Sequence, residues 1–515
     1  MAKFNNPILR GFYPDPSICA VGDDFYLVNS TFAYFPGVPI FHSKDLANWE
    51  QIGNVFTRSS QLNLEKAGHS AGVYAPTIRY NKGKYYLITT NIPHYGNFIV
   101  TADDPRGPWS DPYILEGAEG IDPSLLFDDD GKVYYVGTRD RSEGSKYYGD
   151  NEIWVQELDL EKMQLVGESH AIWNGALRDS AWAEGPHLYK KDGYYYLMIA
   201  EGGTAYEHSV MIARSKTIFG KYEGYKANPI LTHRHLGNKY PIQYIGHADL
   251  VKTNDDEWYM VMLGVRKCQD HCNTGRETFL AKVTWQDGWP VVNEGVGKIE
   301  LEGETTLPEH KFEEKDTSFH FFGNKLDDRF LRLRNPDENM YLLDQRKGFL
   351  RLMLSKYTLK DLESPSYLGI RQDSYNYVLS TMMEFEPEKD GENAGLAILQ
   401  SNKYNLRYEY TKKSGKNILR VVSTKDLNDE VLSEVEITSK RLFLKIIGRD
   451  QKLDFYYSLD GEQYNVLIKN IDSRFLSTEV AEGFVGCTLG MFACSNGNES
   501  SNYADFLYLN YSKLQ

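Results

Sequence analysis

Long apolar segments are missing from this 515-residue sequence, whose mean hydropathy is −0.51. No run reaches the roughly 18 apolar residues that a membrane-spanning helix needs, so the sequence predicts no membrane span. The first residues, MAKFNNPILRGFYPDPS, also lack the apolar stretch of roughly 7 to 15 residues found in signal peptides. The sequence as written therefore predicts a cytoplasmic protein.

Cysteine is scarce, with five residues spread along the chain. An odd and thinly scattered set is not a disulfide framework and agrees with a reducing compartment. Cys268, His271 and Cys272 lie close together in KCQDHC, but no second Cys/His pair follows at the spacing of a zinc site. We therefore expect no structural zinc there.

Basic residues are outnumbered, since 57 Lys and Arg face 72 Asp and Glu, for a formal net charge of −15. This charge repels phosphate backbones and anionic lipid headgroups. The composition therefore predicts neither a nucleic-acid partner nor a membrane partner. It leaves the oligomeric state open, homo-oligomers included.

Long amphipathic helical stripes are also scarce, whereas aromatic residues are abundant, with 37 Tyr, 24 Phe and 8 Trp. Aromatic side chains favour the half-buried surfaces of sheets. Short aromatic and β-branched runs bounded by Gly, Asp and Asn recur throughout the chain, a pattern typical of strands and turns. The sequence predicts an all-β protein with few, short helices.

One phrase recurs five times in residues 1–303, roughly 50 to 60 residues apart. Its copies are GDDFYLV, KGKYYLI, DGKVYYV, DGYYYLM and DDEWYMV. Each reads as a turn that enters an aromatic strand, and the spacing suits a four-stranded unit. Five such units predict a five-bladed β-propeller.

The segment ahead of each phrase is expected to be the innermost strand of its blade. These segments are YPDPSI, YAPTIRY, IDPSLLF, AEGPHLY and GHADLV. Their equivalent positions hold Asp15, Ala75, Asp122, Glu184 and His247, which the rotational symmetry of a propeller brings to one end of its axis. Any one of the acidic residues alone is equally explained as a turn former that caps backbone amides. Together they favour a functional site, because burying several like charges costs stability.

Three carboxylates in one funnel suit the hydrolysis of an acetal. Glycoside cleavage needs one carboxylic acid to protonate the leaving oxygen and one carboxylate to activate water or attack carbon. A third carboxylate beside the acid raises the pKa of that acid and keeps it protonated near neutral pH.

On these motifs the sequence resembles glycoside hydrolase family 43, the five-bladed propeller β-xylosidases and α-L-arabinofuranosidases. Further matching phrases include STFAYFPGVPIFHSKDLANW, AEGGTAYEHS, IGHADLV and TGRETFL. The resemblance implies that Asp15 is the general base, Asp122 the residue that tunes the pKa of the acid, and Glu184 the general acid. It also implies inversion of the anomeric configuration and no required cofactor.

Supporting residues follow from the same resemblance. Arg276 corresponds to an arginine that contacts sugar hydroxyls, although a surface ion pair would also explain it. Phe32, Tyr74 and Ala75 correspond to the wall of the pocket for the terminal sugar. Tyr74 stands where many β-xylosidases of the family have Trp, which favours α-L-arabinofuranosidase while leaving the choice of pentose open.

His247 resembles an axial histidine that holds a water molecule or a calcium ion in many relatives. The metal interpretation is therefore a structural calcium ion on the propeller axis. A buried, hydrogen-bonded histidine without a metal is the alternative.

Residues 304–320 are charged and poor in apolar side chains, so we interpret them as a linker. The short alternating strands of residues 321–515 predict a jelly-roll-like β-sandwich. The resemblance implies that a loop of the sandwich reaches the funnel, with Phe484 beside the pocket; ordinary sandwich core is the alternative for this residue. Such a wall makes a blind pocket, which admits only chain ends.

The predicted function is exo-acting, inverting removal of a terminal α-L-arabinofuranosyl or β-D-xylosyl unit from hemicellulose-derived oligosaccharides. Three alternatives remain at this point. A retaining fructan hydrolase would carry an Asn-Asp-Pro-Asn-Gly type phrase instead of Tyr13-Pro14-Asp15-Pro16-Ser17. An endo-arabinanase needs an open groove, and a non-catalytic sugar-binding propeller would not need all three carboxylates.

Overall fold

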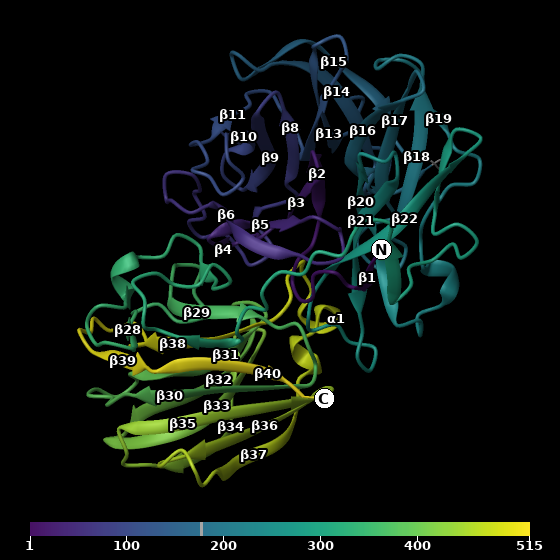
Figure 1. Ribbon diagram of the computed structural model, residues 1–515. Helices are drawn as coiled ribbons and strands as arrows, with labels where there is room; N and C mark the ends of the chain where they lie inside the picture. Colours follow the sequence, from purple (N-terminus) through teal and green to yellow (C-terminus); the bar gives the residue numbers. More distant parts are fainter. Residues whose placement is uncertain (176–178, 515) are drawn as a thin grey trace.

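The computed structural model describes residues 1–175 and 179–514, and strands dominate it. Its helical segments are α1 (Thr478–Ala481) and three short 3-10 turns, η1 (Arg234–Leu236), η2 (Glu338–Met340) and η3 (Arg474–Leu476). The prediction of an all-β protein with few, short helices is confirmed. Within the described ranges, no helix has the length and apolar character needed to cross a membrane. Figure 1 shows the N-terminal part, in purple to teal, beside a C-terminal part in green to yellow.

The N-terminal part contains five antiparallel sheets that follow one another along the chain. The first sheet comprises β2 (Ser17–Val21), β3 (Asp24–Val28), β5 (Gly37–Ser43) and β6 (Glu50–Phe56). The second comprises β7 (Gly72–Val73), β8 (Thr77–Asn81), β9 (Lys84–Ile92), β10 (Gly96–Ala102) and β11 (Tyr113–Ile114). The third comprises β12 (Ile121–Phe127), β13 (Val133–Asp140), β14 (Asn151–Asp159) and β15 (Gln164–Trp173). The fourth comprises β16 (Glu184–Lys191), β17 (Tyr194–Glu201), β18 (Ser209–Ser215) and β19 (Glu223–Gly224), and the fifth β20 (Ile242–Lys252), β21 (Trp258–Arg266), β22 (Glu277–Gln286) and β23 (Trp289–Val292).

The five sheets are arranged in a closed ring. β2 contacts β8, β8 contacts β12, β12 contacts β16, β16 contacts β20, and β20 returns to β2. The five repeated sequence phrases lie on the second strands, β3, β9, β13, β17 and β21. Because the strands before these phrases contact one another around the ring, the residues at their ends can meet at its centre.

Tight hairpins connect the first and second strands of two sheets. Lys82 and Gly83 join β8 to β9, and Asp192 and Gly193 join β16 to β17. All four residues have positive φ, from 48° to 87°. Positive φ at both central residues defines a type I′ turn, whose twist matches that of the flanking strands.

The two ends of the ring are tied together by a separate pair of strands. β1 (Ala2–Asn5) pairs antiparallel with β24 (Glu302–Thr305), which follows the fifth sheet. Next to them, the buried Asn6 side chain donates to the carbonyls of Leu280 and Glu300, both at 2.9 Å. The start of the chain is therefore held against the last sheet.

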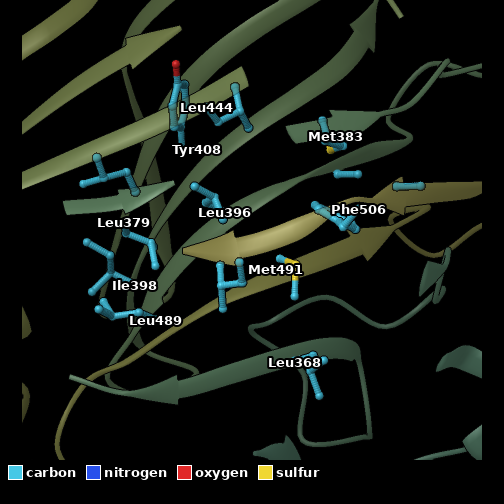
Figure 2. Packing of buried hydrophobic residues seen from close by; sticks show 14 of the residues in the cluster. Leu368, Leu379, Met383, Leu396, Ile398, Tyr408, Leu444, Leu489, Met491 and Phe506 are labelled. Carbon is cyan, nitrogen blue, oxygen red and sulfur yellow. The ribbon is translucent and has the colours of Figure 1, made fainter. Parts of the chain in front are cut away.

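The C-terminal part is a β-sandwich of two sheets. The larger sheet contains β25 (Ser318–His320), β27 (Tyr341–Leu342), β28 (Leu350–Met353), β30 (Tyr377–Glu384), β35 (Arg441–Arg449), β36 (Lys452–Ser458), β37 (Asn465–Asp472), β39 (Tyr503–Phe506) and β40 (Tyr508–Lys513). The other sheet contains β29 (Ser366–Arg371), β31 (Asn393–Leu399), β32 (Tyr404–Lys413), β33 (Lys416–Lys425), β34 (Asn428–Glu436) and β38 (Thr488–Cys494). Along β35 buried residues alternate with more exposed ones, so one face of the strand packs inward. Figure 2 shows this core, in which Leu444 and Phe506 of the larger sheet lie with Ile398 and Met491 of the other.

The two parts share a core. β4 (Tyr34–Phe35) pairs with β26 (Arg332–Leu333), so one short ladder crosses from the first part to the second. Around it, side chains of both parts form one buried cluster, which includes Phe12, Phe32, Tyr34, Leu333, Tyr367 and Phe492. The segment 304–320 between them begins in β24 and ends in β25. The sandwich is therefore packed against the ring next to Phe32.

Candidate active site

The first strands of the five sheets are irregular at the positions that the sequence singles out. The ladder between β12 and β13 shifts register around Asp122, and the ladder between β20 and β21 shifts around His247. In the second sheet the strand is interrupted between β7 and β8, where Ala75 lies. Asp15, Asp122 and His247 have φ of 49°, 54° and 46°, in the left-handed region. Such bulges turn a side chain away from the regular alternation of a strand.

The structure brings all nine predicted site residues to one cavity of about 60 Å³. They are Asp15, Phe32, Tyr74, Ala75, Asp122, Glu184, His247, Arg276 and Phe484. The cavity has two further lining residues, Ile121 and Thr204, which sequence reasoning missed. Ile121 directly precedes Asp122 in the IDPS motif, and Thr204 lies in the quoted AEGGTAYEHS phrase, so position within these motifs was the available signal.

Asp15 is buried and its two carboxylate oxygens have different partners. Ser30 Oγ donates to Oδ2 at 2.5 Å, and Arg276 Nη1 donates to Oδ1 at 3.4 Å. His247 Nδ1 lies 3.9 Å from the same Oδ1 atom. Because a hydroxyl and a guanidinium hold it, the carboxylate has a fixed orientation at the cavity.

Asp122 is linked to the residue that follows Glu184. The backbone N–H of Gly185 donates to Asp122 Oδ2 at 3.0 Å. Gly185 has a φ of 58°, and a Cβ atom there would lie 3.1 Å from the His247 ring, so a larger residue would be strained at this position. Burial raises the pKa of Asp122, the His247 charge opposes this shift, and the Asp15 charge adds to it.

The pKa of the Glu184 carboxyl lies well above its ordinary value. Burial, with a further contribution from the negative charge of Asp122, raises the pKa of Glu184 to about 8. The positive charge of Arg276 acts in the opposite direction. A carboxyl group with this pKa is protonated at neutral pH and can serve as a proton donor.

Aromatic rings form one wall of the cavity. Phe32 contacts Tyr74 edge to face, with 5.4 Å between the ring centroids, and lies 5.8 Å from Phe484. Arg276 Cζ lies 4.8 Å from the centroid of the Phe484 ring. Phe484 comes from the sandwich and packs against residues of the ring, so it lies at the cavity and not in the core between the two sandwich sheets.

A buried polar network links the same strands at residues that follow the cavity residues in the sequence. Arg79 on β8 makes a two-pronged ion pair with Asp249 on β20, at 2.8 and 3.1 Å. Ser17 on β2 and Tyr189 on β16 donate to the same carboxylate, both at 2.7 Å, and His187 lies 3.0 Å from Arg79 Nη2. The network connects four of the five innermost strands beyond the three carboxylates.

Taken together, a protonated carboxyl, a second carboxylate held by a hydroxyl and an arginine, and an aromatic wall are the functional groups of a glycoside hydrolase. The family comparison makes this assignment specific. Residues 4–290 match the model of glycosyl hydrolases family 43, and residues 318–512 match the β-xylosidase C-terminal concanavalin A-like domain. The chain belongs to glycoside hydrolase family 43.

Individual relatives match over the full length of the chain. A xylosidase/arabinosidase of Butyrivibrio fibrisolvens is 51% identical, with 100% of both chains covered. A non-reducing end α-L-arabinofuranosidase of Bacteroides ovatus is 38% identical and covers 99% of this chain and 95% of its own. Among solved structures, a xylan β-1,4-xylosidase from Bacillus halodurans superposes with a TM-score of 0.93 at 35% identity, covering 99% of this chain and 100% of its own.

Proposed function

We propose that this enzyme removes terminal pentose units, α-L-arabinofuranosyl, β-D-xylosyl or both, from the ends of hemicellulose-derived oligosaccharides, with inversion at the anomeric carbon. The observation that carries the proposal is that Asp15, Asp122 and Glu184 line one cavity, in which burial raises the pKa of Glu184 to about 8. The names of the relatives support both pentoses. The small cavity, walled by Phe484, supports action at chain ends.

In the proposed mechanism Asp15 accepts a proton from a water molecule as the water oxygen attacks the anomeric carbon. Glu184 gives its proton to the glycosidic oxygen as the bond between that oxygen and the anomeric carbon breaks. The products are a pentose of inverted configuration and a shortened oligosaccharide. Burial and the negative charge of Asp122 keep Glu184 protonated, and Arg276 binds sugar hydroxyls while it orients Asp15. Phe32, Tyr74, Ala75 and Phe484 enclose the terminal sugar.

Hydrolysis in this scheme needs no cofactor. A structural calcium ion on the ring axis would be bound at His247 by an imidazole nitrogen, whereas Ca²⁺ takes roughly six to eight oxygen ligands. In the described part of the chain, no three His, Cys, Asp or Glu side chains converge as a metal site. Waters would therefore have to supply most of the ligands. Because the proposed acid and base act without a metal ion, dialysis against a chelator is expected to leave the rate of hydrolysis unchanged.

We also propose that the ring of five sheets is a five-bladed β-propeller, with residues 1–303 as the catalytic domain, 304–320 as linker and 321–515 as a jelly-roll-like sandwich. The contacts between successive first strands support the propeller. The five free cysteines support a cytoplasmic location.

The deciding experiment compares initial rates on nitrophenyl α-L-arabinofuranoside and nitrophenyl β-D-xyloside, and follows the first product by proton NMR. Release of pentose with inverted configuration supports the proposal, and the ratio of the two rates gives the preferred sugar. Retained configuration would favour a nucleophilic aspartate instead. A sugar-binding protein would release nothing, and an endo-arabinanase would cleave linear arabinan but neither nitrophenyl substrate.

A further inference from the structure

We propose that the β-sandwich positions Arg276 by holding the loop that leads into it, with Gln451 and Gly486 as positioning residues. The loop, residues 267–275, connects β21 to β22, and Arg276 directly precedes β22. This inference rests on the proposed function, because the position of Arg276 matters to the reaction only if its guanidinium binds the sugar and orients Asp15.

The first part of the argument is a buried pair of side-chain amides across the domain interface. Gln451, in the turn between β35 and β36, is fully buried and its Nε2 donates to Asn273 Oδ1 at 2.9 Å and to the Cys268 carbonyl at 3.0 Å. Asn273 Nδ2 donates to the Ser473 carbonyl at 2.9 Å, and Ser473 Oγ donates to Gln451 Oε1 at 2.8 Å. Both amides therefore have partners at both ends, and removing one leaves buried polar atoms unpaired.

The backbone of the loop is held as well. The N–H of Cys487 donates to the Asn273 carbonyl at 2.8 Å, and the N–H of Thr478 donates to the Cys272 carbonyl at 2.9 Å. The N–H of Cys272 in turn donates to Glu479 Oε2 at 2.7 Å. Within the loop, successive residues ahead of Arg276 thus bond to the sandwich.

Nearest to Arg276, the loop and the sandwich segment that contains Gly486 touch backbone to backbone. A Cβ atom on Gly275 would lie 2.7 Å from the Cα and N of Gly486, and a Cβ atom on Gly486 would lie 2.3 Å from the Thr274 carbonyl oxygen. Only glycine fits on either side of this contact. Two residues from Gly486, the Phe484 ring lies under the Arg276 guanidinium. The sandwich thus contacts Arg276 through its side chain and through the chain that leads to it.

The proposal gives the sandwich a part in catalysis that Phe484 alone does not. Arg276 Nη1 donates to Asp15 Oδ1 at 3.4 Å, a long contact that a small shift of the loop would break. A shift of about 1 Å in a positioning group can lower a rate by about 100-fold. Displacing Arg276 also moves its positive charge away from Glu184, and this raises the pKa of the Glu184 carboxyl.

Two variants test the inference in the full-length enzyme. In Gly486→Ala the added methyl group pushes the 267–275 loop away, and φ at this residue is no obstacle to alanine. Gln451→Met keeps the size of the side chain and removes its amide. Gly323→Ala is the matched control, because a Cβ atom at Gly323 meets nothing closer than 3.9 Å.

We expect kcat/KM on a nitrophenyl pentoside to fall about 10- to 100-fold in Gly486→Ala and less in Gln451→Met. The basic limb of the pH profile should move to higher pH in both, as it should in Arg276→Gln. Combining either variant with Arg276→Gln should cost little beyond Arg276→Gln alone, since all three act on one interaction. Gly323→Ala should match the wild type.

An unchanged basic limb, or a loss that adds in full to that of Arg276→Gln, would overturn the inference even if activity falls, because a general loss of stability produces that result. Unchanged kcat/KM in both folded variants would also overturn it. If Gly486→Ala does not fold, as judged by circular dichroism, Gln451→Met decides the question. Failure of the proposed function is distinct, since the wild-type enzyme would then release no pentose.

Discussion

Asp122 accepts a hydrogen bond from the backbone N–H of Gly185, the residue that directly follows Glu184, with a donor to acceptor distance of 3.0 Å. This bond connects Asp122, whose charge adds to the effect of burial in raising the pKa of Glu184, to the backbone that carries Glu184. An asparagine at position 122 can still accept the bond through its side-chain oxygen but has no negative charge. The substitution therefore separates charge from geometry.

We expect Asp122→Asn to move the basic limb of the pH profile to lower pH. The charge of Asp122 raises the pKa of Glu184, so its removal lets Glu184 lose its proton at a lower pH. The measurement is kcat/KM from pH 5 to 10, and a basic limb that stays in place would show that Asp122 does not tune the acid. Asp122→Ala, which also loses the bond to Gly185, should reduce the rate further.

Replacing Glu184, the proposed acid, should affect substrates unequally. Glu184→Ala is expected to lower kcat on a natural oligosaccharide by about 100- to 10,000-fold, the usual contribution of general acid catalysis. The loss should be much smaller on a nitrophenyl pentoside, because nitrophenolate leaves with little need for a proton. Parallel kinetics on the two substrates check this, and equal losses would argue against Glu184 as the acid.

The raised pKa of Glu184 should also lower the free energy of unfolding above pH 4.5. Glu184 has an ordinary pKa of 4.5 that rises to about 8 in the folded protein, so between these pH values the unfolded chain releases a proton that the folded chain keeps. The contribution of Glu184 to stability is present in full below pH 4.5 and is lost as the pH rises toward 8. Glu184→Gln should therefore raise the free energy of unfolding at pH 7 by on the order of 1–3 kcal/mol.

Thermal unfolding of the wild type and of Glu184→Gln at several pH values tests this expectation. The difference in Tm should be small near pH 4.5 and grow up to about pH 8. Glu143→Gln, at an exposed carboxyl in the same domain, is the control and should show no such trend. A Tm difference that is independent of pH would mean that the gain comes from packing.

Phe484→Ala should raise KM clearly while changing Tm little. The ring contacts Phe32, Tyr74 and Arg276 at the cavity, so its loss removes apolar contact with the sugar and admits water. We expect KM on nitrophenyl pentosides to rise about 10-fold, in line with roughly 1.4 kcal/mol of lost contact. Phe322→Ala, at an exposed ring of the sandwich, is the comparison; a similar KM in both variants would exclude Phe484 from sugar binding.

The repeat made much of this architecture predictable from sequence. The phrases around Tyr26 and Tyr196 lie on second strands, and the positions aligned with them, Asp15 and Glu184, lie at one cavity. The backbone geometry of the site residues was harder to predict from the sequence. The register shift around Asp122 is defined only relative to the strand that pairs with it, and the sequence does not show which aspartates adopt the left-handed φ seen at Asp15.

The KCQDHC segment shows where sequence reasoning ends. Its cysteines and histidine resemble half a zinc site, yet in the structure it is the carbonyls of Cys268 and His271 that matter, because they accept from Gln451 and Tyr375. Contacts between residues so far apart in the chain carry no local signal. Likewise, only the family resemblance, and no pattern in the sandwich sequence, pointed to Phe484.

The ion pair between Arg79 and Asp249 links β8 to β20 beyond the carboxylates, so a sugar in the proposed pocket would leave by the opening through which it entered. With a single mouth, the shortened oligosaccharide lies between the pentose and solvent and must depart before it. The pentose is then the last product bound, so it competes directly with the next substrate molecule. Accumulating monosaccharide would slow this enzyme from within its own binding pocket.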